Sequence, residues 1–139
     1  MQVLYTATAI ATGGRNGRIR SSDGVLDLGL ALPKELGGPG GAATNPEQLF
    51  AAGYAACFEN TLLRVARERK APIQESRVIA HVGIGREEDG VFRLAVALEV
   101  SVPGRDKAEI AELVRVAHEE VCPYSRATRG NMEVDVKVV

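Results

Sequence analysis

The chain has 139 residues, of which 45% are hydrophobic and 25% charged, and its formal net charge at pH 7 is −1. This length and composition predict one soluble globular domain over residues 1–139. A net charge so close to zero argues against a nucleic-acid-binding protein, and no apolar run approaches the roughly 18 residues of a membrane span. Residues 1–11 lack the features of a signal peptide, so we expect a cytoplasmic protein, in which structural disulfides are rare.

The first third of the chain predicts three short strands separated by turns. Residues 3–12 alternate between apolar and polar positions, as strands do. The sequence Gly-Gly-Arg-Asn-Gly at 13–17 predicts a turn, with Asn-Gly as a hairpin signal. Residues 18–22 and 25–32 supply the second and third strands. The run Leu-Gly-Gly-Pro-Gly-Gly at 36–41 predicts an irregular loop, because ordered glycines are entropically costly.

The longest helical pattern follows this loop and covers residues 44–70. Thr44 and Asn45 can cap free backbone N–H groups, and Pro46 suits the first turn of a helix. Glu47 stands three residues after Thr44, the spacing of a capping box. The first half of the segment is mostly apolar, so we expect it to be buried.

The second half of the chain predicts a hairpin, a helix and a last strand. Residues 78–84 and 91–102 flank a charged turn and form the hairpin. Asp106 has Glu109 at the capping-box distance and begins the second helix, which ends near Cys122-Pro123. Residues 132–139 alternate as the final strand. The apolar face of the second helix has spacings of three and four: Ile110, Leu113, Val114, Ala117 and Val121.

The element order is therefore βββ-α-ββ-α-β, which is typical of an α+β protein with an antiparallel sheet and two main helices. One small sheet and one amphipathic helix would leave part of the apolar helix uncovered. Burial against a second copy would cover it, so we predict a homodimer.

Two cysteines, Cys57 and Cys122, are the residues most able to carry chemistry. They form no CxxC motif, and with His81 and His118 they do not make a set of four metal ligands. We expect both histidines to be structural or solvated, and not part of a metal site. Each cysteine is either a small hydrophobic residue of the core or a reactive thiol, and spacing does not decide between the two.

Arg15 offers a way to activate Cys57, because a permanently charged guanidinium beside a thiol lowers its pKa. The alternative for Arg15 is a solvated turn residue. Glu47 lies ten residues before Cys57, about 15 Å along a continuous helix. Either Arg15 therefore lies between Glu47 and the thiol, or the helix breaks near Gly53. An adjacent carboxylate would raise the thiol pKa, so Glu47 would orient Arg15 and not act on Cys57 directly.

Three segments resemble the organic hydroperoxide resistance (Ohr) proteins. Residues 44–58, TNPEQLFAAGYAACF, resemble the segment of the peroxidatic cysteine, and residues 122–131, CPYSRATRGN, the segment of the resolving cysteine. The turn at 13–17 is similar to the arginine loop of these proteins. The likeness covers the whole chain in order. The wider family includes the OsmC group, and the sequence departs from the Ohr pattern mainly by the polarity of residues 59–61, Glu-Asn-Thr.

The resemblance implies a thiol peroxidase without haem, flavin or metal. It implies that Cys57 is the peroxidatic thiolate, that Cys122 resolves it as a disulfide, that Arg15 activates Cys57, and that Glu47 holds Arg15. It also implies an intertwined α+β homodimer and a dithiol reductant, the lipoyl group of a lipoylated protein.

The substrates implied are organic hydroperoxides, and an apolar approach would favour alkyl or fatty-acid hydroperoxides. Two alternatives remain: an OsmC-type peroxidase with other peroxide and thiol preferences, and a non-catalytic binding domain with core cysteines. The expected lining of the approach consists of Leu49, Phe50, Phe58 and Tyr124.

Overall fold

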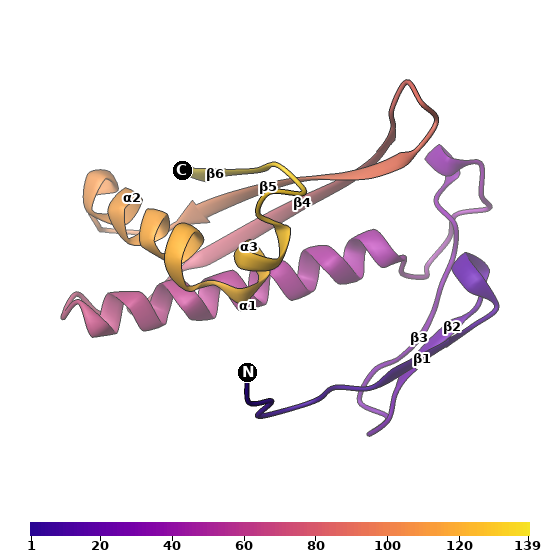
Figure 1. The fold of residues 1–139 in the computed structure, drawn as a ribbon, viewed down its shortest axis with the longest axis horizontal. Helices are drawn as coiled ribbons and strands as arrows, with labels where there is room; N and C mark the ends of the chain where they lie inside the picture. The colour runs from indigo at the N-terminus through magenta and orange to yellow at the C-terminus, as the bar shows by residue number, and fades with distance from the viewer. The chain divides into compact units, whose positions relative to one another are not determined.

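Two three-stranded sheets and three α-helices make up the computed structural model, which describes residues 1–139. The chain divides into two units, Met1–Leu49 and Phe50–Val139, which are described in turn, and Figure 1 shows their elements along the chain. The predicted α+β class and order of elements are confirmed. A single domain over residues 1–139 stays a prediction.

The first unit is built on a small antiparallel sheet in the order β1-β2-β3. Strand β1 (Ala9–Thr12) pairs with β2 (Arg18–Ser21), and β2 pairs with β3 (Asp27–Gly29). The turn between β1 and β2 contains one turn of 3₁₀ helix, Gly14–Asn16. The predicted strand over residues 3–12 is thus shorter than expected, because β2 offers it only four partner residues.

Helix α1 (Pro46–Glu68) begins with a cap that differs from the predicted one. The Asn45 Oδ1 atom accepts a hydrogen bond from the Gln48 backbone N–H at 2.8 Å, and the Thr44 hydroxyl donates to the Gln48 side chain at 2.9 Å. The predicted capping box of Thr44 with Glu47 is therefore wrong. Asn45 is the cap, which leaves the Glu47 carboxylate available for another partner.

The second unit contains the larger sheet, in the order β4-β5-β6. Strands β4 (Arg77–Arg86) and β5 (Phe92–Ser101) form the predicted antiparallel hairpin, with Arg77 opposite Ser101. Strand β6 (Val134–Val138) pairs in parallel with β5, which corrects the expected all-antiparallel sheet. A helical connection lies between β5 and β6, and such a crossover returns the chain parallel to the strand it left.

That connection contains three consecutive helical segments. Helix α2 (Lys107–Val116) is capped by Asp106, whose carboxylate accepts from two backbone N–H groups. A π-helical segment, Ala117–Val121, follows, and then the short helix α3, Pro123–Thr128. The predicted end of the helix at Cys122-Pro123 is thus a junction, because a proline suits the first turn of a new helix.

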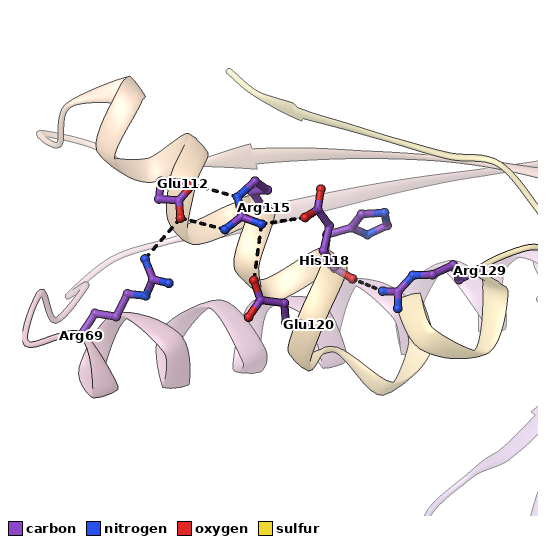
Figure 2. A network of polar contacts seen from close by, with 7 residues as sticks. Arg69, Glu112, Arg115, His118, Glu120 and Arg129 are labelled. Carbon is purple, nitrogen blue, oxygen red and sulfur yellow. Dashed lines mark hydrogen bonds and ion pairs between the residues drawn. The ribbon is translucent and has the colours of Figure 1, made fainter.

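The core of the second unit lies between α1, β5 and α2. Alternate residues of β5 point into it, as the period of a strand requires. The charged residues of α2 lie outside the core, where Arg115 pairs with Glu112, Glu119 and Glu120 (Figure 2). No helix combines the length and apolar character needed to cross a membrane. The main core residues are Tyr54, Phe58, Leu62 and Val65 of α1, Val96, Leu98 and Val100 of β5, and Ile110, Leu113 and Val114 of α2.

Candidate active site

The turn that carries Arg15 owes its shape to glycines. Gly13 has a φ of +75°, a region that L residues with side chains avoid. A Cβ atom on Gly17 would lie 1.7 Å from the Thr12 carbonyl oxygen, so no other residue fits there. The Asn16 Oδ1 atom accepts a hydrogen bond from the Leu32 backbone N–H at 3.0 Å. The backbone geometry of the turn and this hydrogen bond therefore fix the position of the Arg15 backbone, from which its side chain extends.

Arg15 and Glu47 form a bidentate ion pair within the first unit. The two guanidinium nitrogens donate to the two carboxylate oxygens at 2.8 and 2.6 Å. Glu47 is the more buried partner, with 12% of its side chain exposed against 36% for Arg15. Hydrogen bonding to the guanidinium lowers the pKa of Glu47 and raises the pKa of Arg15. The guanidinium is consequently oriented by a carboxylate that stays ionised.

Cys57 lies on α1 and is half-buried against the core of the second unit. Helix α1 continues without interruption through Gly53. The alternative in which the helix breaks at Gly53 is therefore wrong. Thr61 donates its hydroxyl proton to the Cys57 carbonyl at 2.8 Å, and Glu59 accepts from Ser76 at 2.6 Å. Two of the three polar residues after Cys57, Glu59 and Thr61, thus form hydrogen bonds within the second unit.

The structure brings Cys122 near Cys57, although the two are 65 positions apart in the sequence. Cys122 is the residue immediately before α3 and is only 1% exposed. Cys57 packs against the core cluster that contains Cys122, and Cys122 is near enough to raise the pKa of Cys57. No disulfide joins the two cysteines in this structure.

The immediate surroundings of Cys57 favour the neutral thiol. Burial raises the pKa of Cys57, and the neighbouring Cys122 raises it further. A hydrogen bond from the Tyr124 backbone N–H acts in the opposite direction but does not outweigh burial. The predicted lowering of this pKa is thus not produced by the groups of the second unit, and a thiolate at neutral pH would require an added cation.

An aromatic cluster lies beside the thiols. The Tyr124 ring centroid is 5.5 Å from that of Tyr54 and 6.2 Å from that of Phe50. A Cβ atom on Gly53 would lie 2.8 Å from the Tyr124 hydroxyl oxygen. Glycine costs about 1 kcal/mol relative to alanine inside a helix, and here its lack of a side chain makes room for Tyr124.

The expected apolar lining of the approach to Cys57 stays a prediction for Phe50 and Tyr124. Phe50 and Tyr124 belong to the aromatic cluster. Phe58 is completely buried in the core, so its place in the lining was predicted wrongly. Leu49 belongs to the first unit, and its place in the lining stays a prediction.

A set of buried polar residues beside Cys122 was not singled out from the sequence. The Ser125 Oγ atom lies 2.9 Å from the Tyr54 hydroxyl and 3.0 Å from His118 Nδ1. His118, which was expected to be structural or solvated, is half-buried, and burial lowers its pKa, as does Arg129. His81 is exposed beside Glu99, as expected of a solvated residue.

A cavity of about 600 Å³ lies between α2 and β6. Val114, Val134 and Val136 are among the residues that line it, and neither cysteine does. No group of three or more His, Cys, Asp or Glu side chains is arranged to hold a metal ion.

Comparisons with known proteins identify the family of the chain. Residues 38–137 match the family described as OsmC-like protein. The organic hydroperoxide resistance protein of Xanthomonas axonopodis pv. citri (strain 306) is 56% identical over 134 residues, which cover 96% of this chain and 93% of that protein. The organic hydroperoxide resistance protein OhrB of Bacillus subtilis is 46% identical and covers 97% of this chain and 98% of its own length.

Solved structures give the same result. The crystal structure of an organic hydroperoxide resistance protein from Legionella pneumophila has a TM-score of 0.93 at 49% identity, over 99% of this chain and 98% of that one. A corresponding protein from Vibrio cholerae has a TM-score of 0.92 at 51% identity, over 99% of this chain and 94% of that one, and its structure has captopril bound in one of the active sites.

Proposed function

The chain belongs to the OsmC-like protein family, among its organic hydroperoxide resistance proteins, and we propose that it is a cysteine-based peroxidase that reduces organic hydroperoxides to alcohols. One observation carries the proposal: two cysteines from distant parts of the sequence lie near each other in a largely buried site. A disulfide between them requires their Cβ atoms to come within about 3.5–4.5 Å of each other.

The proposed cycle has three steps. The Cys57 thiolate attacks an oxygen of the hydroperoxide, so that an S–O bond forms, the O–O bond breaks and the alkoxide leaves as the alcohol after it gains a proton. The Cys122 sulfur then attacks the sulfenic sulfur of Cys57, and the hydroxyl group leaves as water. An external dithiol reduces the resulting disulfide by two exchanges and is itself oxidised to a disulfide.

Arg15 is proposed as the group that makes Cys57 a thiolate. Burial and Cys122 raise the pKa of Cys57. A neighbouring guanidinium has the opposite effect and lowers a thiol pKa. Glu47 supports this role because its bidentate pair fixes the orientation of the guanidinium. Both residues are thus assigned to the catalytic site as part of the proposal.

The aromatic cluster supports hydroperoxides with an alkyl or acyl chain as substrates. Phe50 and Tyr124 present apolar surface beside the thiols, which would favour such chains over hydrogen peroxide. The proposed reductant is a lipoyl group, a dithiol carried on a lipoylated protein, and the proposed location is the cytoplasm. Turnover of cumene hydroperoxide and hydrogen peroxide at equal rates would contradict the preference for organic substrates.

A homodimer is also proposed, and the first unit supports it. Leu30 is the only one of its apolar side chains that is buried. Large apolar residues such as Tyr5 and Ile10 are 81% and 63% exposed. A second copy of the chain would remove this surface from water. Light scattering should give twice the monomer mass at micromolar concentration, and a monomer mass would contradict the proposal.

The test of the enzymatic function compares the wild type with Cys57→Ser. Cumene hydroperoxide and dihydrolipoamide are supplied, and loss of the hydroperoxide is followed. We expect steady turnover by the wild type and none above background by Cys57→Ser, whose melting temperature should stay close to that of the wild type. A fully active Cys57→Ser protein would exclude the proposed chemistry.

A binding domain with inert core cysteines is the main alternative, and the burial of Cys122 is the observation that favours it. Titration of the native thiols separates the two functions. Inert cysteines would react slowly and would not be lost on addition of a hydroperoxide. An OsmC-type peroxidase would be recognised by comparing dihydrolipoamide with monothiol donors.

A further inference from the structure

A buried chain of hydrogen bonds connects the two cysteine-bearing helices. The Tyr54 hydroxyl of α1 lies 2.9 Å from Ser125 Oγ of α3, which lies 3.0 Å from His118 Nδ1 in the π-helical segment. We propose that this chain, Tyr54–Ser125–His118, positions Cys122 for attack on the oxidised Cys57. The proposal rests on the function proposed above and adds three positioning residues to it.

The places of these residues in the sequence support the proposal. Tyr54 comes three residues before Cys57, about one helical turn, and Ser125 comes three residues after Cys122. Their hydrogen bond therefore joins the turn before one thiol to the turn after the other. His118 reaches the same Ser125 hydroxyl from the side that precedes Cys122. Cys122 thus lies, along the sequence, between His118 and Ser125, whose side chains hydrogen-bond to each other.

Backbone contacts fix the same segment. The Cys122 N–H donates to the Ala117 carbonyl at 2.8 Å, the five-residue spacing of a π helix. The Arg129 guanidinium donates to the His118 carbonyl at 2.8 Å, so the chain after α3 is tied to the segment before it (Figure 2). Cys122 has little freedom to leave its place unless these bonds break.

The burial of these hydrogen bonds indicates that they orient the Cys122 segment and do not only fill space in the core. Tyr54 is 0% and Ser125 1% exposed, and no buried side-chain nitrogen or oxygen lacks a partner. Phenylalanine and alanine would fill almost the same space without the cost of burying two hydroxyl groups. A fully satisfied polar network in an apolar core selects one arrangement of its elements.

The proposed cycle requires one defined arrangement of Cys122 relative to the oxidised Cys57. A sulfenic acid that is not captured by Cys122 can react with a second hydroperoxide to give a sulfinic acid, which exchange with a dithiol does not reverse. A disulfide also requires a narrow range of distances between the two Cβ atoms. Weaker positioning of Cys122 would therefore slow disulfide closure and increase the fraction of over-oxidised Cys57.

The test uses Tyr54→Phe and Ser125→Ala in the full chain, with two readouts. The first is the rate at which the Cys57–Cys122 disulfide closes on addition of diamide, which takes up two electrons and two protons and needs no peroxidase activity. The second is the fraction of sulfinic Cys57, measured by mass spectrometry, at a fixed excess of cumene hydroperoxide. We expect closure to slow by about five- to tenfold, the effect of one lost buried hydrogen bond, and the sulfinic fraction to rise.

Matched variants separate positioning from a general loss of stability. Tyr5→Phe removes a hydroxyl from an 81% exposed tyrosine, and Val65→Ala destabilises α1 in the core away from this chain of hydrogen bonds. Both should close at the wild-type rate. His118→Leu should behave like Ser125→Ala, whereas His118→Asn, which keeps a polar atom near the position of Nδ1, should restore most of the rate.

The outcomes keep the two proposals distinguishable. Wild-type closure rates and sulfinic fractions in Tyr54→Phe and Ser125→Ala would overturn the positioning role. An equal slowing in Val65→Ala would overturn it as well, because stability alone would then explain the effect. Slow closure with diamide in a protein that does not consume hydroperoxide would support positioning and refute the peroxidase.

Discussion

The two pairs of candidate residues are held in opposite ways. Arg15 and Glu47 are charged, lie on a glycine turn and the start of a helix, and are joined by a bidentate ion pair. Cys57 lies on a core helix and Cys122 directly before a short one, and both pack among the apolar side chains of the core. Burial protects a thiol from chance reactions, but it also raises its pKa. A cation kept ionised and oriented by its own carboxylate would supply what the core cannot.

Replacing Cys122 by serine should have the largest effect on the thiol pair. The first turnover should proceed at the normal rate, because Cys57 is intact. Repeated turnover with dihydrolipoamide should then fail, and sulfinic Cys57 should accumulate. Stopped-flow kinetics and mass spectrometry measure the two stages. Sustained turnover by Cys122→Ser would show that Cys122 is not the resolving residue.

Replacing Arg15 by alanine tests whether the charged pair serves the thiol. We expect kcat/KM to fall by about 100-fold at neutral pH, because loss of the guanidinium would raise the pKa of Cys57 further and leave less of it as the thiolate. The pH–rate curve should shift to higher pH, and the thiolate absorbance of Cys57 should appear later in an alkaline titration. Arg20→Ala removes an equal charge from β2 and should change neither curve. An unshifted curve for Arg15→Ala would remove Arg15 from the site.

Glu47→Gln asks how much of the effect of Arg15 depends on orientation. The amide accepts only one hydrogen bond from the guanidinium and carries no charge, so we expect kcat/KM to fall by about tenfold. Activity equal to that of the wild type would show that Arg15 is oriented by other groups.

The same ion pair predicts a loss of stability in acid. The folded state lowers the pKa of Glu47 below its ordinary value of 4.5. The stabilisation by the pair is therefore fully present above the ordinary value and is lost as the pH falls through the lowered pKa. Melting temperatures of the wild type and Glu47→Gln should converge over this range, and a constant difference would contradict the assignment.

Gly53→Ala should have the smallest effect and tests the aromatic cluster. The new methyl group would overlap the Tyr124 hydroxyl and move the ring, whereas alanine favours the helix by about 1 kcal/mol. We expect little change in the melting temperature and a rise of less than about tenfold in KM for cumene hydroperoxide. An unchanged KM would show that the position of Tyr124 does not affect the substrate.

The local features of the fold followed from the sequence because they depend on near neighbours. The β4–β5 hairpin, the Asp106 cap and the apolar face of α2 are all set by residues a few positions apart. The Thr44–Glu47 box failed because two capping patterns overlap there, and Asn45 forms the bond instead. The parallel pairing of β6 depends on a long crossover, which no local pattern contains.

The sequence by itself determined the cysteines, the arginine turn and the helix that carries Cys57, because each is a residue type in a recognisable local pattern. The pairing of Arg15 with Glu47 and the proximity of Cys57 to Cys122 depend on contacts across 32 and 65 positions, which no local pattern contains; the family resemblance implied them, and the tertiary structure shows the ion pair and places the thiols near each other. It also decided the sign of the pKa shift of Cys57 and the buried chain from Tyr54 to His118. Burial sets both, and burial is a property of the packed chain and not of any segment.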